Sequence, residues 1–295
     1  MKKIIERLLI FFLGLPAVIA LVLFLPFYNN LALNLVVIFF SAFGAIEFSM
    51  MLEKKQIKIS KVESGILGAL IPASFTLFFS VKSNTLFLVI IIAGFLWVFL
   101  SRIFSRKKEI DDIAKKIAGC LALFIYPGFF ISFIVIMSIW KNPAAVLLFL
   151  FIAFGNDSLA WLFGSLFGKN NRGIIAVSPN KSAAGFIGGI IGSVLVVIGA
   201  VFLFPSVFSA NELPLLDIKH KPVSSIFIPA IIIGLCTGIA ATLGDLAESA
   251  IKRSCDFKDS GNFMLGRGGV LDSIDSIAIA APVFFLLFTY FFYGS

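Results

Sequence analysis

Residues 225 to 250 read SIFIPAIIIGLCTGIAATLGDLAESA, and the first charged side chain in this stretch is Asp245. A helix needs about 20 predominantly apolar residues to cross the hydrocarbon core of a bilayer, because it rises only about 1.5 Å per residue. The stretch meets this requirement, so it predicts a transmembrane helix with its carboxylates at one end.

Eight further stretches have the same apolar character, and together they set the fold class. Of the 295 residues, 60% are apolar and only 14% are charged, whereas a soluble domain carries about 25% charged residues. The composition excludes a soluble globular protein. We predict an all-α integral membrane protein, a polytopic bundle of about nine transmembrane helices. The predicted spans are residues 7 to 27, 31 to 52, 65 to 81, 85 to 104, 117 to 139, 144 to 168, 184 to 205, 225 to 250 and 273 to 292.

The distribution of Lys and Arg predicts the orientation of this bundle, because basic loops next to spans stay in the cytoplasm. With the N-terminus inside, 20 of the 24 basic residues lie on the cytoplasmic side, and four lie outside: Lys82, Lys141, Lys219 and Lys221. We therefore predict a cytoplasmic N-terminus and an external C-terminus. The first span has one alternative, a cleaved signal peptide, although it lacks an evident A-x-A cleavage site.

No long polar linker, low-complexity tract or internal repeat divides the chain. We predict a single membrane domain over residues 1–295, in which the N-terminal helices of 1–143 precede a catalytic half, 144–295, that carries the motifs. The net charge of +8 comes from loops between apolar blocks, so it indicates topology and no nucleic-acid partner. Three Cys without CxxC or CxxH spacing exclude a disulfide framework and a zinc site.

Two pairs of carboxylates mark the candidate site. Asp245 and Glu248 lie three residues apart at the cytoplasmic end of the eighth span, and Asp272 and Asp275 lie three apart where the ninth begins. Residues i and i+3 share a helix face, and the short connection allows the two pairs to converge. Four converging carboxylates need protons or a cation, and oxygen ligands of this kind suit Mg²⁺.

The loop between the pairs supplies positive charge and glycines. The basic residues of this loop are Lys252, Arg253, Lys258 and Arg267. Such side chains bind phosphate oxygens, Arg in bidentate fashion and Lys as a point charge. Gly266, Gly268 and Gly269 permit positive φ and a close backbone approach to an anion. Acids, bases and a glycine turn together indicate phosphoryl or nucleotidyl transfer. The alternative is a loop whose bases only fix orientation and whose acids cap helices.

This stretch resembles the signature of the bacterial phosphatidate cytidylyltransferases, also called CDP-diacylglycerol synthases. The residues that match in order and spacing are Ser249, Lys252, Arg253, Lys258, Asp259, Gly268, Gly269, Asp272 and Asp275. Three positions depart from the pattern: Leu265 and Arg267 stand where the family has Pro and His, and Ser273 stands where it has Arg. Arg267 restores one positive charge among these phosphate contacts.

A second region resembles the same family. Asn156 and Asp157, in the sixth span, match its Asn-Asp element. The loop from Val177 to Gly189 is similar to the family's Ser-Pro-Lys-Lys-Thr-type loop, and its candidate substrate contacts are Ser178, Asn180, Lys181 and Ser182. The resemblance covers about residues 150 to 280, and the count of basic residues places both regions on the cytoplasmic side.

The resemblance implies transfer of CMP from CTP to phosphatidate, giving CDP-diacylglycerol and pyrophosphate in phospholipid biosynthesis. It implies CTP and membrane phosphatidate as partners, Mg²⁺ with or without a second cation as cofactor, and an active site on the cytoplasmic face of the inner membrane. We assign Asp245, Asp272 and Asp275 as catalytic residues and metal ligands, with Asp275 orienting or deprotonating the lipid phosphate. Glu248 is a further metal ligand. The assigned substrate contacts are Asn156, Asp157, Ser178, Asn180, Lys181, Ser182, Ser249, Lys252, Arg253, Lys258, Asp259, Arg267, Gly268 and Gly269.

Three alternatives remain. A CTP-dependent lipid-alcohol kinase would transfer the γ-phosphate in place of CMP. A membrane cation transporter would carry acids near mid-bilayer on several helices, and a degenerate relative would have lost activity. The paired acids lie at cytoplasmic helix ends beside a basic loop, and all three signature Asp residues are present, which favours the transferase.

Two further features have no assigned chemistry. Glu47 lies inside a predicted span, where it either hydrogen-bonds within the bundle or lines a lipid cavity. Glycines of the seventh span have overlapping GxxxG spacings, which favour close helix packing and permit a homodimer without requiring one. They are Gly185, Gly188, Gly189 and Gly192.

Overall fold

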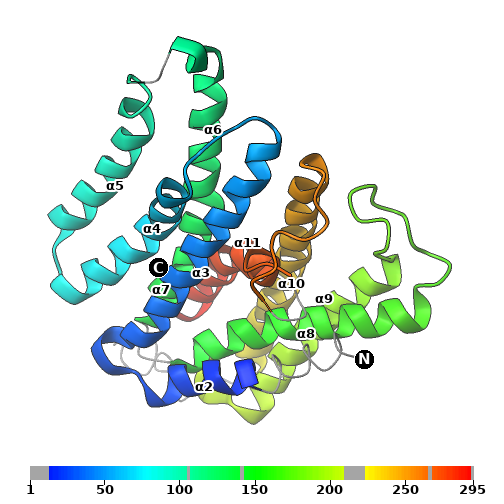
Figure 1. The fold of residues 1–295 in the computed structure, drawn as a ribbon. Coiled ribbons are helices and arrows are strands. Elements are labelled where there is room, and N and C mark those ends of the chain that lie inside the picture. The colour runs from blue at the N-terminus through cyan, green and yellow to red at the C-terminus, as the bar shows by residue number, and fades with distance from the viewer. Residues whose placement is uncertain (1–12, 105–106, 140–142, 209–222, 265–267, 294–295) are drawn as a thin grey trace. The chain divides into compact units, whose positions relative to one another are not determined.

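A computed structural model of the chain describes residues 13–104, 107–139, 143–208, 223–264 and 268–293. Apart from two isolated bridges, every regular element in these ranges is helical, and no β-strand occurs among them. The predicted all-α class is therefore confirmed (Figure 1).

The described part of the chain is a series of helices (Figure 1). Their bounds are α2 (Leu15–Phe24), α3 (Phe27–Lys54), α4 (Lys61–Val81), α5 (Asn84–Leu100), α6 (Ile113–Leu123), α7 (Phe130–Ser138), α8 (Pro143–Phe167), α9 (Ala183–Leu203), α10 (Val223–Ser254) and α11 (Leu271–Phe288). The connection between α8 and α9 is a long loop over residues 168–182. Short 3₁₀ or π segments cover Lys107–Asp112, Phe124–Phe129, Pro205–Phe208 and Thr289–Tyr293. The hydroxyls of Ser60, Ser83 and Ser182 cap α4, α5 and α9 by accepting a backbone N–H bond.

Seven of the described helical stretches are long and apolar enough to cross a membrane. They are Phe27–Lys54, Lys61–Val81, Ile110–Ser138, Ala144–Phe167, Ala183–Leu203, Ile226–Ser254 and Leu271–Phe292. Each overlaps one predicted span, which supports a multi-pass membrane protein. The apolar helix α5 has 17 residues and matches the predicted span 85 to 104, whereas the span 7 to 27 begins outside the described residues. The exact count of nine and the orientation of the termini stay predictions.

The chain forms two compact units, each described here by itself. The first unit comprises Met1–Ile139 and Ile251–Ile274, and the second comprises Trp140–Ala250 and Asp275–Ser295. Both units combine segments that are distant in sequence, because α10 and α11 each contribute residues to both. The single membrane domain over 1–295 stays a prediction.

In the first unit, α3 and α4 pack closely because Gly68 faces the neighbouring helix. A Cβ atom on Gly68 would lie 2.5 Å from the Cβ of Ala45 and 2.6 Å from the carbonyl oxygen of Ser41. The Ser41 hydroxyl also donates a 2.6 Å hydrogen bond to the carbonyl oxygen of Gly68. These contacts fix the position of α3 in this unit, and a buried apolar cluster extends the core: Leu67, Ile71, Val98, Cys120 and Phe124.

In the second unit, α8 and α9 lie side by side with glycines at their interface (Figure 1). All four glycines of the GxxxG pattern are buried. A Cβ atom on Gly188 would lie 2.8 Å from the carbonyl oxygen of Leu159, and one on Gly189 would lie 3.0 Å from Oδ1 of Asn156. The prediction that this spacing serves close helix packing is confirmed, and the partner helix belongs to the same chain.

Candidate active site

The signature loop of the first unit is organised around Asp272, in the first turn of α11. Its Oδ2 accepts hydrogen bonds from the backbone N–H groups of Ser260 (2.9 Å) and Gly269 (2.7 Å). Its Oδ1 accepts a 2.6 Å bond from Nζ of Lys252, and the Asp272 side chain is only 8% exposed. The carboxylate therefore ties both ends of the loop to the start of α11.

Gly268 satisfies two constraints in this loop. Its φ of +106° lies in the left-handed region that side chains rarely adopt. A Cβ atom at this position would also lie 2.6 Å from Oδ2 of Asp272. The glycine thus allows the backbone to turn tightly against the carboxylate.

A second carboxylate, from α3, holds the same loop. Glu47 is only 5% exposed. Its Oε1 accepts a bond from the N–H of Val270 (2.9 Å), and its Oε2 accepts bonds from the N–H of Leu271 (2.8 Å) and the hydroxyl of Ser260 (2.9 Å). Of the two roles considered for Glu47, hydrogen bonding within the bundle is confirmed.

Side chains of α3 and of the turn after it also contact the loop. The Phe263 ring packs against Phe43 and Phe39, with centroids 5.2 Å and 6.0 Å apart. Nearer the end of α3, Lys55 pairs with Asp256 at 3.2 Å. Together with the Glu47 hydrogen bonds, these contacts hold the described part of the loop against the second half of α3.

The other loop bases lie nearer to solvent. Arg253 is exposed and donates a 3.2 Å bond from Nη1 to the carbonyl oxygen of Phe257. Lys258 and Asp259 are exposed as well, so these three side chains are not held inside the unit as Lys252 and Asp272 are. Arg267, with Leu265 and Gly266, lies outside the described residues.

In the second unit, the second motif region meets the acid of α10. Lys181, just before α9, forms an ion pair with Asp245, and both side chains are partly exposed. The backbone N–H of Lys181 donates a 3.1 Å bond to the carbonyl oxygen of Ser178, which closes the loop. Ser182 is buried and caps α9 by accepting a 3.1 Å bond from the Gly185 N–H, whereas Asn180 is exposed.

The same unit brings α10 against the start of α11. A Cβ atom on Gly244 would lie 2.5 Å from the carbonyl oxygen of Asp275, and Gly244 directly precedes Asp245. One acid of each predicted pair therefore lies at this crossing. Glu248, one turn further along α10, is fully buried, with 0% exposed, and Ser249 beside it is buried too.

Asn156 and Asp157 face different surroundings. Asn156 is 3% exposed, and its Nδ2 donates to the hydroxyl of Ser193 (3.1 Å) and to the carbonyl oxygen of Gly238 (3.0 Å). Its Oδ1 accepts a 3.3 Å bond from the Thr242 hydroxyl. Through these bonds the Asn156 amide joins α8, α9 and α10, which is a packing role. Asp157, by contrast, is exposed.

Four carboxylates are candidate metal ligands: Asp245, Glu248, Asp272 and Asp275. Within the described ranges, no group of three or more His, Cys, Asp or Glu side chains is arranged to hold a metal ion. Mg²⁺ does not require such a cage, because it keeps several waters and is usually bound by one or two carboxylates together with substrate phosphates. Asp245 and Asp275, at the crossing of α10 and α11, have the right chemistry for that mode.

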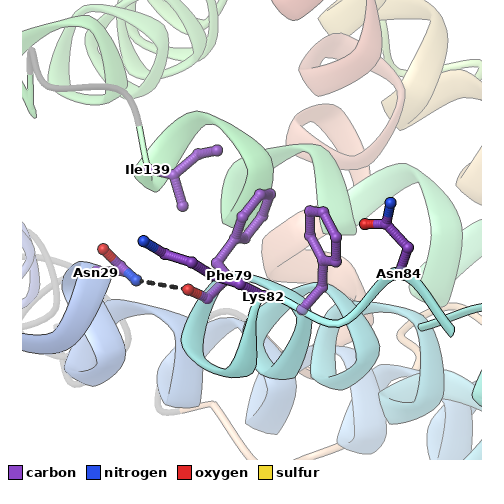
Figure 2. A pocket seen from close by; sticks show the side chains of 6 residues that line it. Asn29, Phe79, Lys82, Asn84 and Ile139 are labelled. Atoms are coloured by element: carbon purple, nitrogen blue, oxygen red, sulfur yellow. Dashed lines mark hydrogen bonds between the residues drawn. The ribbon is translucent and has the colours of Figure 1, made fainter. Parts of the chain in front are cut away.

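The first unit contains a cavity lined by residues of α4 and of the ends of its neighbouring helices (Figure 2). It measures about 330 Å³ and lies where α3 begins, α4 ends and α5 begins. Asn29 closes one side by donating a 3.0 Å bond to the carbonyl oxygen of Phe79. The regular part of α3 begins after Asn30, and Glu47 lies 17 residues beyond Asn30, roughly 25 Å at 1.5 Å per residue, so this cavity is not part of the loop site. Its lining residues are Asn29, Phe78, Phe79, Lys82, Asn84 and Ile139.

Sequence reasoning identified Lys252 and Asp272 but missed Glu47 and Ser260 as parts of the site. An acid inside an apolar span was the available signal for Glu47. No pattern in the sequence distinguishes Ser260 from other loop serines, because its role depends on contacts with α3.

Comparison with known proteins relates almost the whole chain to one group. Residues 5–291 match the model of the cytidylyltransferase family. A phosphatidate cytidylyltransferase of Thermotoga maritima is 32% identical over 223 residues, 76% of each chain, and one of Staphylococcus haemolyticus is 34% identical over 171 residues, 58% of each. An uncharacterized protein of Escherichia coli, YnbB, is 34% identical over 145 residues, which is 49% of this chain and 42% of that protein. The matches thus span between about two fifths and three quarters of these relatives' lengths.

Proposed function

The chain belongs to the cytidylyltransferase family, and from this premise we propose that it is a phosphatidate cytidylyltransferase. It transfers CMP from CTP to phosphatidate and releases pyrophosphate, forming CDP-diacylglycerol for phospholipid biosynthesis. The observation that carries the proposal is the family match over residues 5–291, which includes the loop that Asp272 and Lys252 organise. The named relatives support the choice of phosphatidate as acceptor.

In the proposed reaction, an oxygen of the phosphatidate phosphate attacks the α-phosphorus of CTP. A bond forms between them, the bond from the α-phosphorus to the bridging oxygen of the β-phosphate breaks, and pyrophosphate leaves. Positioning and charge stabilisation account for most of the acceleration in such transfers. No protein nucleophile is needed, so the residues act by binding and orienting both substrates.

The charged residues divide into two proposed groups. Asp245 and Asp275 would hold Mg²⁺ together with substrate phosphates, and Glu248 and Asp272 are further candidate ligands. When bound, Mg²⁺ would neutralise charge on the phosphate oxygens. Asp275 also orients or deprotonates the phosphatidate phosphate. The cationic side chains that contact the triphosphate are Lys181, Lys252, Arg253, Lys258 and Arg267.

The remaining assignments concern the substrate pocket and the membrane. Ser178 and Asn180 contact CTP, and Ser182 holds their loop against α9. Gly268 and Gly269 form the turn beside the nucleotide, with their N–H groups bonded to the Met264 carbonyl oxygen and the Asp272 carboxylate. Asp157, Ser249 and Asp259 are further candidate contacts, and Asn156 supports them by packing α8 against α9 and α10. The protein crosses the inner membrane nine times, with a cytoplasmic N-terminus, an external C-terminus and a cytoplasmic active site. A homodimer would use a surface other than the GxxxG glycines, because α8 covers them.

The proposal is tested by purified membranes that contain the chain or one of three variants, D245N, D272N or D275N. Each variant removes one negative charge at nearly constant volume. We expect CMP transfer to phosphatidate in the wild type and a loss of at least about 100-fold in each variant, because each removes about 2.7 kcal/mol or more of transition-state stabilisation. Wild-type rates in all three variants would refute the assigned roles.

A further inference from the structure

We infer that Glu47 is a positioning residue: from a different helix, it holds residues 256–264 and 268–272, the described parts of the proposed phosphate-binding loop, in their working shape. The inference rests on the proposed function for what the loop binds, but the contacts that support it are independent of that function. All of them lie within the first unit. They link α3, in the first fifth of the chain, to the signature near its end.

Both oxygens of the Glu47 carboxylate accept hydrogen bonds from the backbone at the start of α11. Val270 and Leu271 supply two of the N–H groups that a helix leaves without an intrahelical partner at its N-terminus. Glu47 accepts both, at 2.9 Å and 2.8 Å. Because the helix dipole favours negative charge there, Glu47 acts as an N-terminal cap supplied by another helix.

Two glycines of the loop allow this contact. A Cβ atom on Gly261 would collide with Oε1 of Glu47, and one on Gly269 would collide with Oε2. Both φ values are ordinary, since only Gly173 and Gly268 among the described glycines have positive φ. The glycines at 261 and 269 are thus explained by the space that the Glu47 carboxylate needs.

A chain of hydrogen bonds leads from Glu47 to a proposed phosphate contact. The Ser260 hydroxyl donates to Glu47 at 2.9 Å and accepts from the Asp272 N–H at 3.2 Å. The Ser260 N–H donates to the Asp272 carboxylate, which accepts from Lys252. Displacing Glu47 therefore shifts the Lys252 ammonium group as well as the glycine turn.

The test compares E47Q and E47D with E53Q. The E47Q substitution keeps the shape of the side chain but turns one acceptor into a donor that faces a backbone N–H. The E47D substitution keeps both acceptors at a shorter reach. Glu53 lies on the same helix and is exposed, so E53Q makes the same chemical change away from the loop. Two readouts are measured: the kcat and KM of CMP transfer, and hydrogen exchange of the backbone amides of Val270 and Leu271.

We expect E47Q to lower kcat by roughly 10- to 100-fold, since a misplacement of about 1 Å can cost 100-fold. Exchange at the two amides should accelerate at least tenfold, while E53Q matches the wild type in both readouts. E47D should recover part of the kcat. A general loss of folding would instead lower the amount of active enzyme at unchanged kcat per folded molecule, which would overturn the positioning role.

The two proposals fail in distinguishable ways. Absence of CMP transfer in the wild type would refute the proposed function. Hydrogen exchange at the Val270 and Leu271 amides would still decide whether Glu47 holds the loop. Normal kcat and normal exchange in E47Q would refute the positioning role alone. If E47Q does not accumulate in membranes, S260A removes only the hydroxyl link. An S260A enzyme with wild-type kcat and exchange would equally refute it.

Discussion

Lys252 donates a 2.6 Å hydrogen bond to the carboxylate of Asp272, which lies twenty residues further along the chain. Both side chains are largely buried, so each charge compensates the other where water is scarce. The pair joins the end of α10 to the start of α11 and thereby closes the signature loop. It links a base assigned to phosphate binding with an acid assigned to the catalytic group.

The first prediction concerns this pair. K252M removes the cation and leaves the Asp272 carboxylate without it in a buried setting, which should lower the free energy of unfolding by about 3 kcal/mol. CMP transfer should fall by at least about 100-fold. Thermal unfolding in detergent and initial rates would measure the two effects. K58M changes an exposed lysine of the same unit and should alter neither; equal behaviour of the two variants would argue against the role of the pair.

The second prediction concerns the pair of Lys181 and Asp245. Both side chains are partly exposed, so the ion pair contributes at most about 1 kcal/mol to stability. K181M should therefore leave thermal unfolding nearly unchanged but raise the KM for CTP by about tenfold, as loss of about 1.4 kcal/mol of phosphate binding requires. Steady-state kinetics at varied CTP would measure this, and an unchanged KM would exclude Lys181 from the nucleotide site.

The third prediction concerns the glycine turn. In G269A the new methyl group would collide with the Ser260 hydroxyl and the Glu47 carboxylate and would lie 2.6 Å from the N atom of Gly261. Overpacking of this kind costs about 1 to 3 kcal/mol, and the turn should move with a large loss of activity. G199A offers a control, because apart from the adjoining backbone of its own helix no atom lies within 4 Å of the new Cβ there. Activity in G269A equal to that of G199A would contradict the described packing.

The fourth prediction concerns the metal. Chelation with EDTA should abolish CMP transfer, and added Mg²⁺ should restore it, because the proposed ligands Asp245 and Asp275 would hold the ion only together with substrate phosphates. D245N should need a higher Mg²⁺ concentration for half-maximal rate. Full activity after exhaustive chelation would show that the carboxylates serve another purpose.

Much of the fold was predictable, because each transmembrane helix is encoded by a continuous apolar stretch. Seven predicted spans match helices of sufficient length, and the GxxxG glycines pack as expected. Helix ends were less predictable: α10 continues to Ser254, past the predicted end at residue 250. Lys252 and Arg253, which the sequence placed in the loop, therefore lie in the last turn of α10.

The site was only partly predictable, for a physical reason. Lys252 and Asp272 lie close in sequence, so a local pattern finds them. Glu47 lies 213 residues from Ser260 and 224 from Leu271, and one sequence contains no signal for contacts of that range. A motif can also match a residue that has a packing role. The motif suggested Asn156 as a pocket residue, whereas its hydrogen bonds join three helices.

The most direct test of the account is the fate of the α-phosphate of CTP. Purified chain in phosphatidate-containing vesicles is incubated with α-labelled CTP and Mg²⁺, and the lipid fraction is separated. The account predicts label in a lipid that co-migrates with CDP-diacylglycerol, with one pyrophosphate released per labelled lipid. Label that stays in the aqueous phase, while γ-labelled CTP labels lipid, would identify a lipid kinase and contradict the central claim.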